Sequence, residues 1–334
     1  MKKIIAALCS ILIIASALSG CAAAPKTADH EQVKVVATIF PLYDWVREVA
    51  GDDVDINLDL LLDNGVDLHS YQPTAKDIMD ISDCDIFVYV GGESDKWVAD
   101  TLKQADNKDM IVLDLMDILG DKAKEEELKE GMQEDEHEHE EGEEEHDEDH
   151  EHEEEPEYDE HVWLSLKNTK LFVEKIAEAL SKADSQHANA FKTNAESYTQ
   201  KLDSLDKQYT EAVDNASVKT LLFGDRFPFR YMTDDYKLDY YAAFVGCSAE
   251  TEASFETITF LSNKVDELGL KTIMQIESSD GSIAKTIRDN TKTKDQEILT
   301  LDSIQNVTAE RIKAGETYLS IMESNLDVLK KALA

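Results

Sequence analysis

The chain has 334 residues and a formal net charge of -39 at pH 7. This length accommodates two domains, since a domain typically has about 150 residues. The negative charge disfavours nucleic acid and anionic lipid headgroups as partners of the folded part, and it attracts divalent cations.

The N-terminus predicts a secreted lipoprotein. Two lysines precede an apolar stretch at residues 4–18, which is shorter than the roughly 20 residues of a membrane-spanning helix. Leu18, Ser19 and Gly20 then precede Cys21, as at the processing sites of bacterial lipoproteins. We therefore expect a signal peptide at residues 1–21, lipidation at Cys21 and a tether at residues 22–32. The protein would be extracytoplasmic and anchored to the bacterial cell membrane.

The mature chain begins with alternating strand and helix patterns. Strands are expected at four apolar runs, residues 33–40, 55–62, 85–90 and 110–115. Pro41 suits the first turn of a helix that Gly51 would end. This alternation predicts a parallel sheet flanked by helices, in an N-terminal α/β domain of residues 33–185.

An acidic, histidine-rich tract interrupts this domain at residues 134–155. It contains 16 carboxylates, one glycine and five histidines, namely His137, His139, His146, His150 and His152. This composition is typical of divalent-cation capture, and a disordered acidic spacer is the alternative. We expect the tract to be an accessory collector of metal ions.

A long helix and a second α/β domain follow. Residues 186–214 are interpreted as a rigid linking helix, with a coiled-coil segment as the less favoured alternative. The α/β alternation then repeats in a C-terminal domain of residues 215–334. Its expected strands are residues 218–223, 240–245, 271–276 and 297–301, and its expected helices are residues 226–235, 255–268, 281–290 and 308–333.

Ligand-type side chains follow several predicted strands. His69 follows the second strand, His161 precedes a helix after the acidic tract, and Asp225, Glu277 and Asp280 follow strands of the second domain. Ligands of open α/β sheets bind beyond the carboxyl ends of the strands, often between domains. Asp225 and Asp280 also suit helix N-caps, which need no metal. The convergence of these residues predicts a metal site in the interdomain cleft.

Besides the predicted lipid anchor Cys21, the mature part contains two cysteines, Cys84 and Cys247. A disulfide between them is conceivable in an oxidising compartment. We interpret both as small hydrophobic residues in separate halves of the protein. The sequence contains no CxxC motif and no Cys–His spacing typical of zinc sites.

Three segments resemble the signatures of one family. They are ATIFPLYD at residues 37–44, GVDLHSYQP at residues 65–73 and EHVWLS at residues 160–165. They are similar to the zinc/manganese class of substrate-binding lipoproteins that feed ATP-binding-cassette importers. The resemblance covers nearly the whole mature chain, including the acidic histidine loop typical of zinc-specific members. It implies two α/β domains bridged by a rigid helix, with His69 and His161 as the first two metal ligands.

The remaining ligands depart from the family pattern. The family has His or Glu in a segment resembling His-x-Ala-Phe-x-Tyr, whereas residues 224–231 read GDRFPFRY and place Arg226 at that position. A guanidinium cannot bind a metal. We therefore predict Asp225 as the third ligand and, from the resemblance, Asp280 as the fourth. Reserve candidates are Glu277, Glu250 and Glu252.

The expected function is capture of Zn²⁺ and its delivery to the permease and ATPase subunits of an importer, by a monomer without enzymatic activity. The same ligands also suit Mn²⁺, so a manganese or iron receptor is the alternative, although nitrogen ligands favour zinc over manganese. A surface metal buffer or adhesin without a transport role is another alternative. A metallohydrolase is disfavoured because the sequence lacks HExxH and four ligands would close the coordination shell.

Overall fold

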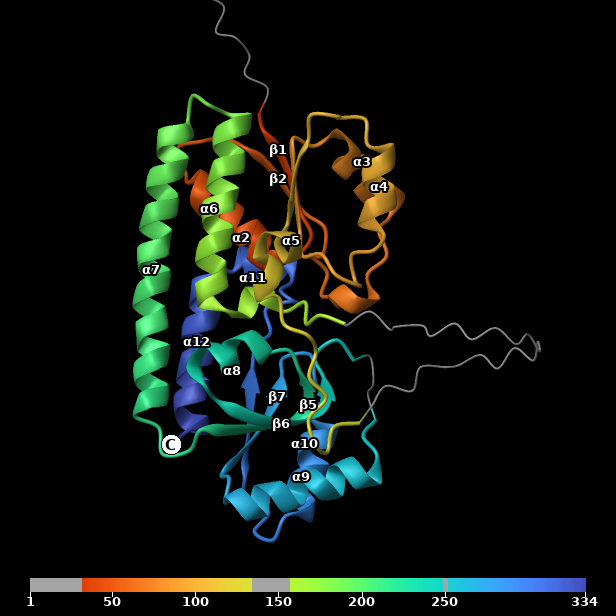
Figure 1. Cartoon of the computed structure of the whole chain (residues 1–334), viewed down its shortest axis with the longest axis vertical. Helices are drawn as coiled ribbons and strands as arrows, with labels where there is room; N and C mark the ends of the chain where they lie inside the picture. The colour runs from red at the N-terminus through yellow and green to blue at the C-terminus, as the bar shows by residue number, and fades with distance from the viewer. Residues whose placement is uncertain (1–31, 134–156, 249–251) are drawn as a thin grey trace, which may run out of the picture. The chain divides into compact units, whose positions relative to one another are not determined.

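The computed structural model describes residues 32–133, 157–248 and 252–334. The predicted signal peptide, Cys21 and the tether up to residue 31 lie outside the described residues, as do the acidic tract and Glu250. Residues Val33–Ala334 form one compact unit, whose helices and strands are labelled in Figure 1.

The N-terminal half is built on a parallel sheet in the order β2-β1-β3-β4. Its strands are β1 (Lys34–Ala37), β2 (Asn57–Leu60), β3 (Ile86–Tyr89) and β4 (Ile111–Asp114), and the helices after them are α2 (Phe40–Ala50), α3 (Ala75–Asp83), α4 (Val98–Gln104) and α5 (Leu115–Leu119). β1 lies between two neighbours, which is why its side chains are almost all buried. As predicted, Pro41 lies in the first turn of α2 and Gly51 ends that helix with a φ of 69°.

The C-terminal half repeats this design in the strand order β6-β5-β7-β8. Its strands are β5 (Thr220–Phe227), β6 (Asp239–Val245), β7 (Thr272–Ile276) and β8 (Glu297–Leu301), and the helices between them are α8 (Arg230–Tyr236), α9 (Phe255–Leu268) and α10 (Ser282–Asn290). The predicted fold of two α/β halves with parallel sheets is therefore confirmed.

The longest helix, α7 (Ala188–Asp214), lies along both halves (Figure 1). It packs on α2 and α6 (Leu166–Ala183) of the N-terminal half and on α12 (Tyr318–Ala332) near the end of the chain. The remaining elements are short: α11 (Ala309–Lys313) and the 3-10 helices η2 (Leu68–Ser70), η3 (Gly120–Lys122) and η4 (Val162–Leu164).

The largest differences from the sequence-based prediction are in β5, in α8, which begins at Arg230 instead of residue 226, and in the final helix. β5 continues through Asp225, which was expected to follow the strand, and its register against β6 shifts between Phe223 and Arg226. Glycine at position 224 lets α10 pack closely against β5 at this point, because a Cβ there would lie 2.6 Å from the Cα of Ala284 in α10. The predicted final helix is divided into α11 and α12 at Gly315, whose φ is 93°.

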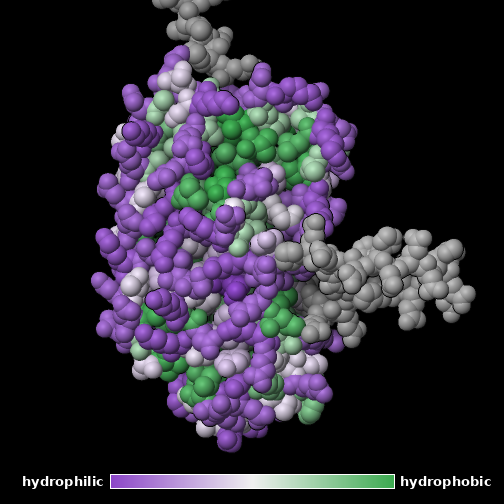
Figure 2. Space-filling model, viewed as in Figure 1, coloured by the Kyte–Doolittle hydropathy of each residue, from purple (hydrophilic) through white to green (hydrophobic). Residues whose placement is uncertain are grey.

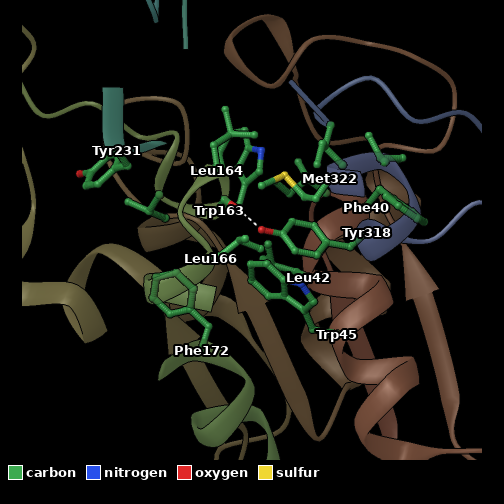
Figure 3. Packing of buried hydrophobic residues seen from close by; sticks show 14 of the residues in the cluster. Phe40, Leu42, Trp45, Trp163, Leu164, Leu166, Phe172, Tyr231, Tyr318 and Met322 are labelled. Atoms are coloured by element: carbon green, nitrogen blue, oxygen red, sulfur yellow. Dashed lines mark hydrogen bonds between the residues drawn. The ribbon is translucent and has the colours of Figure 1, made fainter. Parts of the chain in front are cut away.

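The largest hydrophobic cluster is continuous through both halves. Figure 3 shows its centre, where Trp45 of α2 packs edge-on against Tyr318 of α12 with ring centroids 5.2 Å apart. The Tyr318 hydroxyl donates to the carbonyl of Trp163 at 2.7 Å. The first residue of α12 thus packs beside α2 of the N-terminal half.

The surface reflects the acidic composition. The face drawn in Figure 2 is mostly hydrophilic, with hydrophobic patches separated by polar residues. Among helices within the described ranges, none combines the length and apolar character needed to cross a membrane.

Candidate metal centre

The loops at the carboxyl ends of the two sheets meet each other. The guanidinium of Arg226, in β5, forms an ion pair with Asp67, which lies in the loop after β2. The indole N–H of Trp163 donates to the carbonyl of Ser303, beyond β8, at 2.8 Å. These contacts place His69 and His161, although 92 residues apart in sequence, at one junction.

His69 is held by contacts to its backbone and to its Nδ1 atom. It lies in η2, where the Asp67 carboxylate accepts from the His69 backbone N–H at 3.0 Å. Its Nδ1 lies 2.7 Å from the Ser94 hydroxyl and 3.6 Å from a carboxylate oxygen of Glu160. Because Nδ1 is engaged in this way, Nε2 is the nitrogen that the ring presents to the junction.

His161 is fully buried and has a similar arrangement. Asp159 Oδ1 accepts from the His161 backbone N–H at 2.8 Å and lies 3.0 Å from Nδ1 of the ring. The Nε2 atoms of His161 and His69 are 3.4 Å apart. A carboxylate behind the outer nitrogen of each imidazole is the usual support of a metal-binding histidine.

The separation of the two Nε2 atoms fits a shared metal ion. Two nitrogens bound to tetrahedral zinc at their usual distances are about 3.3 Å apart. Burial lowers the pKa of His69 to about 3, and the neighbouring His161 contributes in the same direction. A neutral His69 is the form that can bind a metal.

Cys247 completes a cluster with this pair. Within the described ranges, the group of potential ligand atoms lying within 4.8 Å of one another consists of His69, His161 and Cys247. Burial raises the pKa of the Cys247 thiol well above its usual value, and the nearby Glu126 carboxylate adds to the effect. A bound divalent cation acts in the opposite direction because it stabilises the thiolate.

The predicted carboxylate ligands lie apart from this cluster. Asp225 and Asp280 line a 410 Å³ cavity that His69 also borders. Asp225 accepts from the backbone N–H groups of Arg226 at 2.9 Å and Ile276 at 3.2 Å. Asp280 is exposed and accepts from the Ser282 N–H at the start of α10 at 2.7 Å.

The reserve carboxylates are placed differently. Glu277 holds the loop after β8, since its two oxygens accept from the backbone N–H and the hydroxyl of Ser303, both at 2.7 Å. Burial raises the pKa of Glu277 to about 7, and the nearby Asp302 carboxylate adds to this. Glu252 is exposed and directly follows the undescribed residues 249–251.

Arg226 connects two of the loops that carry the cluster. Besides its ion pair with Asp67, it donates to the carbonyl of Ser248 at 3.4 Å. Burial acts to raise the pKa of Asp67, but the Arg226 guanidinium outweighs burial and holds this pKa below its usual value. Arg226 therefore joins the loop that carries His69, through Asp67, to the turn that carries Cys247, through Ser248.

Sequence reasoning missed the position of Cys247. Its side chain was interpreted as a small hydrophobic residue, whereas its neighbours are imidazoles and carboxylates. Cys247 lies two residues beyond the end of β6, so the rule that selected residues following strands could have identified it. The contacts from Asp159 and Ser94 carry no comparable sequence signal, because both residue types are common in loops.

Comparison with known proteins assigns the chain to a family. Residues 35–332 match the family model described as "ZnuA: Zinc-uptake complex component A periplasmic". The chain belongs to this family. Members of the zinc-uptake component A family are substrate-binding receptors, so the sequence-based resemblance is confirmed.

Three similar proteins illustrate the range of the family. The zinc-binding lipoprotein AdcA of Streptococcus pneumoniae is 32% identical over 338 residues, covering 99% of this chain and 61% of the relative. The high-affinity zinc uptake system protein ZnuA of Bacillus subtilis is 29% identical over 303 residues, covering 91% of this chain and 88% of the relative. The Zn(II)-bound ZnuA-like domain of Streptococcus pneumoniae AdcA superposes with a TM-score of 0.68 at 29% identity, covering 91% and 99% of the two chains.

The curated streptococcal relatives are longer than this chain. The chain spans 56% of the Streptococcus pyogenes protein and 61% of the Streptococcus pneumoniae protein. The solved ZnuA-like domain, in contrast, is covered almost completely. The similarity therefore concerns the part of those proteins that has the ZnuA-like fold.

Proposed function

We propose that the protein captures Zn²⁺ outside the cytoplasm and delivers it to the permease of an ATP-binding-cassette importer. The observation that carries the proposal is the pair of Nε2 atoms of His69 and His161, 3.4 Å apart in a buried junction with a carboxylate behind each ring. The zinc-binding relatives named above support the identity of the ion.

An acidic cavity beside the histidine pair supports cation capture. This 250 Å³ cavity contacts both His69 and Cys247, and four glutamates line it: Glu93, Glu126, Glu157 and Glu160. A hollow lined by one sign of charge concentrates counter-ions. The cavity therefore offers a divalent cation a favourable approach to the imidazoles.

The proposal includes how the receptor works in the cell. Lipidation at Cys21 would hold it at the outer face of the membrane, where it meets the permease while the ATPase subunit acts from the cytoplasm. It would act as a monomer and as a carrier of its ion, without an enzymatic step. The acidic tract of residues 134–155 would collect additional ions.

A zinc titration of the full chain in mild detergent tests the proposal. Competition against a chromophoric chelator should reveal one tight Zn²⁺ site that His69→Ala and His161→Ala each weaken by at least about 100-fold, because each removes a ligand. His187→Ala is the matched control, since His187 also pairs with an aspartate, Asp184, but on the surface. It should leave the tight site unchanged.

Other results would overturn parts of the proposal. Tight Mn²⁺ binding with only loose Zn²⁺ binding would make the protein a manganese receptor, and the lack of a tight site for either ion would exclude a receptor role. Deleting residues 134–155 should reduce the number of weakly bound zinc ions and keep the tight one. Loss of the tight site on deletion would contradict the role of an accessory collector.

A further inference from the structure

We propose that the Cys247 thiolate is the third protein ligand of the zinc site, beside the imidazoles of His69 and His161. The inference rests on the proposed function, because it concerns the same ion. It replaces the carboxylate predicted at position 225 with a sulfur ligand.

The thiol is already close to a coordinating position. The potential ligand atoms of the cluster all lie within 4.8 Å of one another. In a tetrahedral zinc site a sulfur and a nitrogen ligand are about 3.6 Å apart. The separations within the cluster therefore exceed the tetrahedral value by at most about 1.2 Å, and a side-chain adjustment of that size would bring the sulfur and the two imidazoles onto one ion.

The backbone before Cys247 is fitted to the histidine ring. A Cβ at Gly246 would lie 3.1 Å from Cε1 and Nδ1 of His161 and 2.9 Å from the carbonyl oxygen of Phe227. Glycine thus allows this turn to approach the imidazole closely. The Cys247 backbone N–H also donates to Glu126 at 3.0 Å, which fixes the turn to the segment that follows η3.

Asp225 has a structural task of its own. Its two oxygens accept from the N–H groups of Arg226 and Ile276, which ties β5 to the end of β7. A cation at Asp225 would also lie near the Arg226 guanidinium, which repels it. Asp225 is therefore better explained as a residue that positions these strand ends.

Arg226 supports the thiol site from outside the cluster. Its ion pair with Asp67 and its hydrogen bond to the carbonyl of Ser248 hold together the turns that carry His69 and Cys247. The chain thus has a positioning cation where family members have a third ligand, and a cysteine in the next loop supplies the ligand atom. One explanation thus covers the arginine at position 226 and the position of the cysteine beside the histidines.

The proposed ligand set of two imidazoles and one thiolate predicts selectivity. Thiolate is a soft ligand that suits zinc, whereas manganese prefers carboxylate and water oxygens. Binding replaces the thiol proton by the metal ion and releases that proton to solvent, so no oxidant or reductant takes part. The cysteine accordingly favours zinc over manganese more strongly than an aspartate would.

Cobalt substitution tests the ligand directly. We would load the full chain, in detergent, with one equivalent of Co²⁺ and record its absorption spectrum. A thiolate–cobalt bond gives an intense near-ultraviolet charge-transfer band that imidazole and carboxylate ligands do not give. The band should be present in the wild type and in Cys84→Ala, whose thiol is buried in a separate hydrophobic cluster, and absent in Cys247→Ser.

Zinc affinity separates this inference from the proposed function. Cys247→Ser should weaken Zn²⁺ binding by at least about 100-fold, and Asp225→Asn should weaken it much less. Two results would overturn the thiolate ligand and leave the receptor function intact. One is a wild type that binds zinc tightly but lacks the charge-transfer band. The other is loss of the tight zinc site in Asp225→Asn with its retention in Cys247→Ser. Absence of tight zinc binding in the wild type would refute both.

A measurement on the wild type covers the case in which Cys247→Ser does not fold. Alkylation of the chain by iodoacetamide, followed by peptide mapping, should show that Zn²⁺ protects Cys247. Equal alkylation rates with and without zinc would contradict the proposal.

Discussion

Substitution of Asp159 by asparagine should weaken zinc binding without removing a ligand. Asp159 is 2% exposed, and its Oδ1 accepts from the His161 backbone N–H at 2.8 Å and faces Nδ1 of the ring at 3.0 Å. The substitution removes the negative charge behind the ring and allows the amide to turn its NH₂ group toward Nδ1. Either change disturbs the tautomer that directs the Nε2 lone pair toward His69.

The size of the effect follows from the supporting role of Asp159. Loss of such a partner of a metal-binding histidine typically costs 10- to 100-fold in affinity, which corresponds to about 1.4 to 2.7 kcal/mol. The zinc-free protein should also lose about 1 to 2 kcal/mol of stability, because a buried hydrogen bond to a charged group is weakened. The zinc-dependent part of the stabilisation should fall by about 1.4 kcal/mol for each tenfold loss of affinity.

The assay combines a competition titration with thermal unfolding in the presence of excess zinc and of EDTA. Asp184→Asn is the matched control, because Asp184 makes the same kind of contact with His187 Nδ1 on the surface. The control should keep the wild-type zinc affinity. If Asp159→Asn folds and its affinity stays within about twofold of the wild type, then Asp159 does not orient His161 for metal binding.

Three further predictions concern the packing around the site and the core. Gly246→Ala should destabilise the protein by about 1 to 3 kcal/mol and weaken zinc binding, because the new methyl group meets the His161 ring at 3.1 Å. Denaturant unfolding measures the first effect and zinc titration the second. An unchanged zinc affinity would contradict the close fit. Tyr318→Phe should lower the free energy of unfolding by about 1 to 3 kcal/mol, because the carbonyl of Trp163 loses its buried donor. Surface substitutions scatter by about 0.5 kcal/mol, so a smaller change than this would show that the hydrogen bond does not stabilise the fold. Burial raises the pKa of Asp44 to about 6, so the folded protein holds the proton of this side chain more tightly than the unfolded chain does. The stability that this difference provides is fully present below about pH 4 and is lost as the pH rises through about 6. Between these limits in EDTA, the free energy of unfolding of the wild type should fall by roughly 3 kcal/mol relative to Asp44→Asn, and parallel pH profiles would refute the shift.

The fold was largely predictable because its strands are buried apolar runs separated by strong helix boundaries. The predicted bounds of α9 and β8 agree with the structure, and the other strands differ by a few residues at their ends. The extension of β5 through Asp225 was not predictable, because Gly-Asp-Arg has the composition of a strand end. It is a strand because Arg226 and Phe227 pair with Phe244 and Val245 of β6 after a shift in register.

The site was predictable only where a local motif carries it. His69 and His161 lie in segments that resemble family signatures, and the structure brings their rings together. The neighbours of Cys247 depend on contacts between loops far apart in sequence. The Arg226–Asp67 pair, for example, joins residues separated by 159 positions, and no sequence spacing encodes such a contact. The roles of Asp225 and Asp280 as ligands remain predictions.

The hydrophobic cluster shared by the two halves limits how the proposed receptor could release an ion. Smaller clusters lie under α9 and α10 and under α3 and α4, but the largest one includes residues of both sheets and of α2, α7 and α12. Swinging the halves apart would expose this apolar interior to water, which disfavours a large separation of the halves. In the proposed function, ion exchange with a permease would then be confined to the turns around Asp67, Arg226 and Cys247. A transporter would need only to displace these turns, a local rearrangement that would leave the body of the receptor rigid.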